Sequence, residues 1–154
     1  MAPSDALLRT LAAVPPGARV VDAASGAGRH LVPLAQLGFD VHGFAVDPTP
    51  ARAALAEVLG EEEAAARVRR AAPDALDLAD ASADWVVVAD VENLKAALVE
   101  AARVLKPGAW VWAEADGPDA LAEAARAAGL LEAQEPAEAD GRAHAVYRKA
   151  GGVG

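Results

Sequence analysis

Five acidic side chains are the main candidates for chemistry in this sequence. Each one follows a short, mostly apolar segment that could form a strand. They are Asp22, Asp47, Asp74, Asp90 and Glu114. An ionised carboxylate accepts hydrogen bonds through two oxygens, so it suits a diol, an amino group or a cation. Acidic residues are also favoured before the N-termini of helices, which would place them there without any ligand. Five acids after five successive segments favour a shared binding site over that alternative.

A glycine-rich turn follows the first of these acids. Residues 19–30 read RVVDAASGAGRH, in which Val20 and Val21 are typical of a buried strand. Residues 23–28 are all small, so a ligand could approach the main chain closely, and glycine takes positive φ without steric cost. A strand, a glycine-rich loop and a helix in this order are typical of nucleotide-binding sites. The alternative is an ordinary turn that binds nothing.

Alternating strands and helices must position these residues. Apolar runs and their turn residues predict strands at 19–22, 39–46, 68–72, 84–89, 109–115, 131–135 and 142–148. Start and stop signals predict helices at 5–14, 29–37, 50–59, 61–66, 92–105 and 118–128. Thr49 is expected to cap the helix that begins at Pro50. This alternation indicates a parallel sheet with helices on both faces, which a final antiparallel pair closes.

In such a sheet, ligands bind outside the carboxyl ends of the strands, near the point where the strand order reverses. The five acids are predicted to lie at that edge. The length of 154 residues fits one domain. We assign it to residues 1–150 and interpret 151–154 as a flexible tail.

Composition narrows the classes of partner. A formal net charge of −9 argues against a nucleic-acid partner, which normally needs a basic surface. The chain has no cysteine, and its three histidines are scattered, so no metal site is expected. No apolar run is long enough to span a membrane and no signal peptide is evident, so we expect no membrane partner and a cytoplasmic location.

Residues 22–28, DAASGAG, are similar to the acid-GxGxG motif of the class I S-adenosylmethionine-dependent methyltransferases, and the resemblance covers nearly the whole chain. It implies an α/β fold of the Rossmann-like methyltransferase type, a three-layer sandwich whose seven-stranded sheet is mostly parallel with an antiparallel final strand. It also implies S-adenosyl-L-methionine as cofactor. Asp22, Gly26 and Gly28 would belong to the cofactor site. Ala24 replaces the first glycine of the motif, and its methyl group would press on the methionyl part of the cofactor.

Further cofactor contacts follow from the same resemblance. Asp47, which precedes Pro48, matches the acid that binds the ribose hydroxyls. Asp74 would accept from the adenine amino group, and the main-chain N–H of Ala75 would meet the ring. Residues 102–108, ARVLKPG, closely resemble the helix-to-turn signature of the family, which contributes no chemistry of its own.

The acceptor half of the site is expected to be reduced. Only residues 89–93 connect the fourth strand to the next helix, which is shorter than the substrate-facing loop that the family usually has. Asp90 is expected to hold the methionyl ammonium, and Asp90 and Glu114 are the weak candidates for catalysis. The acceptor would be a small molecule or a protein. A second copy of the chain could complete the pocket as a homodimer.

Three residues near the site have simpler interpretations. His30 is interpreted as an ordinary first-turn residue, because a positive imidazole is disfavoured at a helix N-terminus. Trp110 and Trp112 are interpreted as packing residues of the fifth strand.

Two other functions stay open at this point. A nicotinamide-dependent oxidoreductase also begins with a glycine-rich loop, but its fingerprint needs a small residue where this chain has Leu31. A methyltransferase-like module that binds cofactor or a partner without catalysis would be consistent with the short 89–93 connection.

Overall fold

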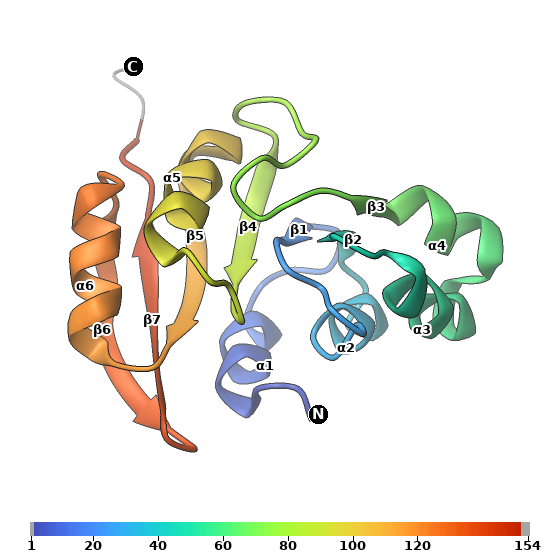
Figure 1. Ribbon diagram of the computed structural model, residues 1–154, viewed down its shortest axis with the longest axis horizontal. Coiled ribbons are helices and arrows are strands. Elements are labelled where there is room, and N and C mark those ends of the chain that lie inside the picture. The colour runs from blue at the N-terminus through green and yellow to red at the C-terminus, as the bar shows by residue number, and fades with distance from the viewer. Residues whose placement is uncertain (1, 152–154) are drawn as a thin grey trace.

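The computed structural model describes residues 2–151, in which helices and strands alternate as predicted (Figure 1). The helices are α1 (Asp5–Ala12), α2 (Leu31–Gln36), α3 (Thr49–Leu59), α4 (Glu61–Arg67), α5 (Leu94–Val104) and α6 (Pro118–Ala127). The strands are β1 (Arg19–Asp22), β2 (Asp40–Ala45), β3 (Val68–Arg70), β4 (Ala83–Val88), β5 (Leu105–Ala115), β6 (Leu131–Ala139) and β7 (Arg142–Arg148).

All seven strands form one sheet in the order β3-β2-β1-β4-β5-β7-β6. The first five strands pair in parallel, and β7 runs antiparallel to both β5 and β6. The predicted mostly parallel sheet with an antiparallel final strand is therefore confirmed. Strand order reverses between β1 and β4, which opens a crevice at their carboxyl ends.

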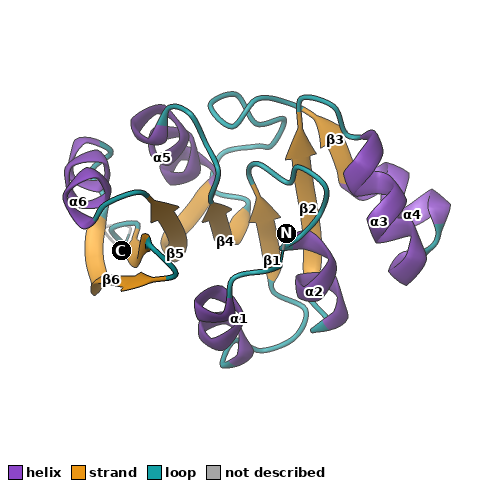
Figure 2. Ribbon diagram, turned by 60° about the horizontal axis from the view of Figure 1, so that its bottom comes forward, coloured by secondary structure: helices purple, strands orange, loops and turns teal. Residues whose placement is uncertain are grey.

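Helices cover both faces of the sheet and make the three layers of the sandwich (Figure 2). One core joins α1, α2, α3 and α4 to the face that carries Val20, Val87 and Trp112. The other core joins α5 and α6 to the opposite face, where Val86 and Val111 lie. The central strands β1 and β4 are buried on both sides, which explains their continuous apolar sequences.

Several element boundaries differ from the predictions because local hydrogen bonds decide them. α2 begins at Leu31 rather than at residue 29, since residues 26–30 form turns. α5 begins at Leu94, because the Asn93 side chain caps it by accepting the Ala96 N–H at 3.1 Å. β5 extends back to Leu105, beyond the predicted start at residue 109.

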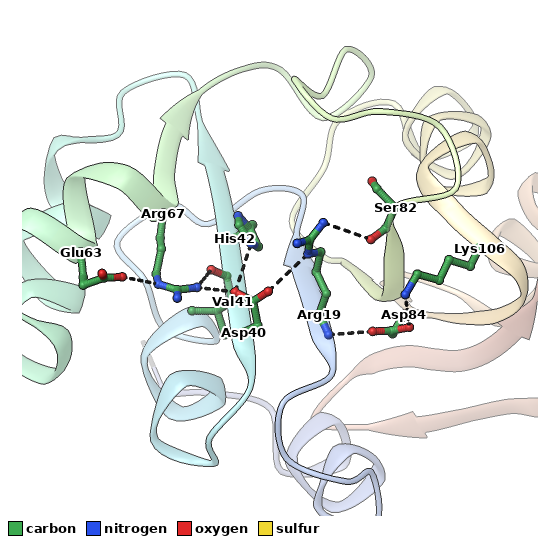
Figure 3. A network of polar contacts seen from close by, with 9 residues as sticks. All are labelled: Arg19, Asp40, Val41, His42, Glu63, Arg67, Ser82, Asp84 and Lys106. Carbon is green, nitrogen blue, oxygen red and sulfur yellow. Dashed lines mark hydrogen bonds and ion pairs between the residues drawn. The ribbon is translucent and has the colours of Figure 1, made fainter.

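A network of charged side chains ties the strands together at their amino-terminal edge (Figure 3). Asp40, the first residue of β2, contacts Arg67 at the end of α4 and Arg19 at the start of β1. The Arg19 N–H in turn donates to Asp84 on β4 at 2.8 Å, and Lys106 on β5 pairs with Asp84 at 3.0 Å. These contacts help to set the strand register from the edge opposite to the crevice.

Candidate active site

The crevice at the carboxyl edge contains a cavity of about 1230 Å³. Four segments that follow β1, β2, β3 and β4 supply most of its wall, together with residues of α2, Pro50 and Pro3. The predicted cofactor residues that line it are Ala24, Gly26, Gly28, Asp47, Asp74 and Asp90. Three others, Asp22, Pro48 and Ala75, are not part of its lining. The structure thus brings most of the predicted residues to one place.

The glycine loop follows a path that other residues would take only with strain. Gly26 has φ of 53° and Gly28 has φ of 90°, both in the left-handed region that favours glycine. Hydrogen bonds hold the loop, since the Ser25 N–H donates to the Phe44 carbonyl at 2.8 Å and the Gly28 N–H donates to the Ser25 carbonyl at 2.7 Å. The loop is therefore preformed beside the cavity.

Asp22 ends β1 directly behind this loop. Its side chain is buried, with 1% exposure, and neither carboxylate oxygen has a hydrogen-bond partner among the described residues. Burial raises the pKa of Asp22 to about 6. Ser25 and the Ala24 N–H lie near enough to lower the pKa of Asp22 in part, but neither has the geometry of a full hydrogen bond, so a ligand or water could still donate here.

Asp47 lies at the rim of the cavity and is exposed. Its Oδ1 accepts the Thr49 N–H at 3.1 Å, and this hydrogen bond lowers the pKa of Asp47. The prediction that Thr49 caps α3 is wrong, because Thr49 is already the first helical residue and Asp47 supplies the accepting oxygen. Asp47 therefore stays ionised, and its Oδ2 takes no part in this hydrogen bond.

Asp74 lies in the long connection between β3 and β4, which Arg103 of α5 holds in place. Arg103 donates to the carbonyls of Leu76 and Leu78 and pairs with Asp80 at 2.6 Å. Nearby, the Ala75 N–H donates to the Ala72 carbonyl at 3.1 Å, so it would have to change partner to meet an adenine ring. The family signature, which includes Arg103, therefore positions the segment that carries Asp74.

Four charged side chains form what we call the acceptor-side cluster, Arg29, Asp90, Glu114 and Arg142. Asp90 contacts Arg29 at 2.7 Å and Arg142 at 3.3 Å. Glu114, whose side chain is 11% exposed, lies 3.6 Å from both arginines. Asp90 also has φ of 59°, a strained conformation for a residue other than glycine. The two predicted catalytic candidates are thus adjacent, and both face guanidinium groups.

Neither arginine of this cluster was among the site residues predicted from the sequence. Arg29 follows the glycine loop directly, so its place beside the cavity had a local signal. Arg142 had none, because β7 is far away in sequence and comes to this edge only by running antiparallel to β5. Arg29 also donates to the Ala2 carbonyl at 3.1 Å, which holds the segment before α1 beside the cavity.

His30 lines the cavity as the N-cap residue of α2. Its side chain is 3% exposed, and its ring meets Trp112 edge-on with 6.2 Å between centroids. Burial lowers the pKa of His30 to about 4, so the imidazole is neutral near pH 7. Trp112 is fully buried, as expected of a packing residue, whereas Trp110 is 39% exposed and stacks on Trp85.

The described residues lack two features that would point to other classes of protein, a metal centre and a membrane span. No group of three or more His, Cys, Asp or Glu side chains in residues 2–151 is arranged to hold a metal ion. Within the same part of the chain, no helix has the length and apolar character needed to cross a membrane.

Comparison with solved structures shows where this fold occurs. An S-adenosylmethionine-dependent methyltransferase from Aquifex aeolicus is 18% identical, covers 93% of this chain and 87% of its own, and superposes with a TM-score of 0.73. The 1,6-didemethyltoxoflavin-N1-methyltransferase of Burkholderia thailandensis is 22% identical over 96% of this chain and 80% of its own, with a TM-score of 0.66. The [4+2]-cyclase SpnF is 18% identical with the same coverage and a TM-score of 0.73. At these identities the likeness concerns the fold.

Sequence comparison identifies the family. Residues 21–113 match the family described as "Methyltransferase domain", a match that runs from the end of β1 to the last third of β5. It includes the glycine loop, Asp47, Asp74 and Asp90, and it covers more than half of the chain. The chain therefore belongs to the class I S-adenosylmethionine-dependent methyltransferases, and S-adenosylmethionine is its cofactor.

Proposed function

We propose that the cavity holds S-adenosylmethionine along the β1 to β3 ends and a small-molecule acceptor beside the acceptor-side cluster. The observation that carries this proposal is the gathering of Asp47, Asp74 and Asp90 around one cavity next to a preformed glycine loop. At about 1230 Å³ the cavity exceeds the roughly 300–1,000 Å³ usual for one ligand, so it has room for two.

The donor and acceptor groups of the site fit the cofactor. Asp47 can accept from ribose hydroxyls through Oδ2, and Asp74 is exposed at the cavity wall for the adenine amino group. The unpartnered oxygens of Asp22 suit a nearby donor, directly or through water. Bound S-adenosylmethionine supplies a methyl group activated by a sulfonium.

The residues of this chain contribute mainly by positioning and by excluding water. The short 89–93 connection and the strained Asp90 form a fixed wall, which Arg29 and Arg142 hold. Asp90 lies between two guanidiniums, and its oxygens could also accept from the methionyl ammonium of the cofactor. Glu114 lies behind both arginines, so its action as a base requires a shift of one arginine side chain.

Calorimetry with S-adenosylmethionine and with NADH tests the cofactor assignment. We expect S-adenosylmethionine to bind and NADH not to bind. Asp47→Ala should weaken the binding of S-adenosylmethionine by about 1–3 kcal/mol, the usual loss when a charged hydrogen-bond acceptor is removed. Asp119→Ala, at an exposed position of α6, is the matched control and should bind as wild type. Undiminished binding by Asp47→Ala would remove the ribose assignment.

Turnover tests the acceptor half. Cofactor consumption is measured with small amines, alcohols and acids for wild type, Asp90→Asn and Glu114→Gln. Tight cofactor binding without turnover at any protein concentration would favour the non-catalytic module. Turnover that rises faster than linearly with protein concentration would support a homodimer that completes the pocket. The protein acceptor, the homodimer and a cytoplasmic location stay predictions.

A further inference from the structure

The charges that line the cavity are predominantly negative. Four carboxylates face it, those of Asp47, Asp74, Asp90 and Glu92, against one guanidinium, that of Arg29. Bound S-adenosylmethionine adds one net positive charge, which leaves the carboxylates in excess. Low-dielectric walls around an acidic cleft raise the local concentration of cations and repel anions.

Glu92 is the acid on the acceptor side that no cation neutralises. It lines the cavity from the 89–93 connection, and no basic group of residues 2–151 lies within ion-pair distance of it. Asp90 and Glu114, by contrast, share Arg29 and Arg142. Asp116 is fully exposed and lies 3.9 Å from Arg142, so Arg142 meets a third carboxylate.

His30 adds no positive charge to this site. Its ring lines the cavity and is neutral near pH 7, because burial lowers the pKa of His30 to about 4. Its buried Nε2 has no hydrogen-bond partner among the described residues, so a cavity-lining side chain keeps one unpaired nitrogen. Apolar side chains of Pro3, Val32 and Val91 complete the wall. The cavity therefore suits a molecule with a cationic head and an apolar body.

We propose that the methyl acceptor is a small amine that enters the cavity as its ammonium form, and that Glu92 is the specificity-determining residue that selects its charge. This inference rests on the proposed function. The ammonium first loses one proton to solvent. The lone pair of the nitrogen then forms the N–C bond while the S–C bond of the sulfonium breaks and its electron pair stays on sulfur. The products are a methylammonium and a neutral thioether.

Binding to the protein loaded with sinefungin tests the charge preference, because this analogue keeps a positive charge at the sulfonium position. Aliphatic and aromatic monoamines, such as 2-phenylethylamine, are compared by calorimetry with the alcohol and the carboxylate of the same skeleton. We expect each amine to bind about threefold to tenfold more tightly than its alcohol, as one or two nearby carboxylates would give. The carboxylates should bind most weakly. Added salt should reduce the preference.

Glu92→Gln should remove most of this preference while sinefungin affinity stays near wild type. Glu123→Gln, at an exposed position of α6, is the control. Equal affinity for amine and alcohol, tighter binding of the carboxylate, or no amine binding to sinefungin-loaded protein would each overturn the inference. An unchanged preference in Glu92→Gln would remove the role of Glu92. Failure of sinefungin itself to bind would instead overturn the proposed function.

Discussion

Asp22, behind the glycine loop, and His30, which lines the cavity, are both buried, and their pKa shifts have opposite effects on stability. Burial raises the pKa of Asp22 from 3.8 to about 6, so the folded protein binds this proton more tightly than the unfolded chain does. Burial lowers the pKa of His30 from 6.5 to about 4, so the unfolded chain binds that proton more tightly. The stabilising contribution of Asp22 is therefore lost as pH rises through 6, and that of His30 is lost as pH falls through 4.

Single substitutions should separate these opposing effects. In the Asp22→Asn variant only the His30 contribution remains. Its free energy of unfolding should therefore rise more steeply with pH between 4 and 6.5 than that of wild type. His30→Gln should give the reverse trend. Over this pH range, each substitution should alter the pH-dependent part of the free energy of unfolding by on the order of 3 kcal/mol, since each pKa moves by about two units. Urea unfolding at half-unit pH steps measures it, and variants whose pH profiles run parallel to wild type would contradict it.

Gly43 shows a further constraint at the residue scale. A Cβ at this position of β2 would lie 2.6 Å from Ser25 Oγ and 2.7 Å from Leu31 Cδ2, so the glycine loop and α2 approach the strand too closely for any side chain. We expect Gly43→Ala to destabilise the protein by about 1–3 kcal/mol through overpacking. Gly117→Ala is the control, because a Cβ there meets nothing within 4 Å. Equal urea midpoints for the two variants would disprove this prediction.

At the scale of elements, α5 acts as a support for the connection between β3 and β4. Arg103 reaches across from α5 to the backbone of that connection, and Glu100 of the same helix accepts the Leu76 N–H at 2.6 Å. In the described part of the chain this connection contains no helix (Figure 2), so these hydrogen bonds hold a segment that would otherwise depend on the packing of Leu76 and Leu78. The signature arginine thus serves the cofactor site without touching it.

Arg103→Lys should loosen this connection, because an ammonium cannot reproduce the several directed hydrogen bonds of a guanidinium. We expect a loss of roughly 1–3 kcal/mol in stability, together with faster amide exchange in residues 71–82 and weaker cofactor binding. Arg126→Lys, at an exposed position of α6, is the control. Unchanged exchange in residues 71–82 would show that Arg103 does not hold the connection.

At the scale of the whole molecule, stability is distributed unevenly across the sheet. β1 and β4 lie at its centre between two cores. β6 forms an outer edge, pairs only with β7, and is exposed at every residue except the half-buried Pro136. Its glutamates Glu132, Glu135 and Glu138 protect this edge from pairing with another chain.

The rate of native-state hydrogen exchange should therefore increase with distance from the centre of the sheet. We expect amides of β4 to exchange only through global unfolding, whereas amides of β6 open locally and exchange about 100-fold faster or more. β7 should be intermediate, because it pairs on both sides. Protection of β6 equal to that of β4 would show that the sheet opens as one unit.

The alternation of elements, the glycine loop and the acids at the strand ends could all be predicted from the amino-acid sequence. Hydrophobic periodicity and turn residues are local signals, and the shared direction of parallel strands then places Asp47, Asp74 and Asp90 at one edge. Helix starts were displaced by a few residues, because single hydrogen bonds such as that of Asn93 decide them.

The contacts on the acceptor side, by contrast, became evident only from the three-dimensional fold. Arg142 reaches Asp90 because β7 reverses direction, which brings its first residue beside the last residues of β5. The burial that shifts the pKa values of Asp22 and His30 likewise depends on how loops and helices pack over the sheet. These contacts join residues distant in sequence, and no local pattern encodes a contact whose two partners are positioned by different elements.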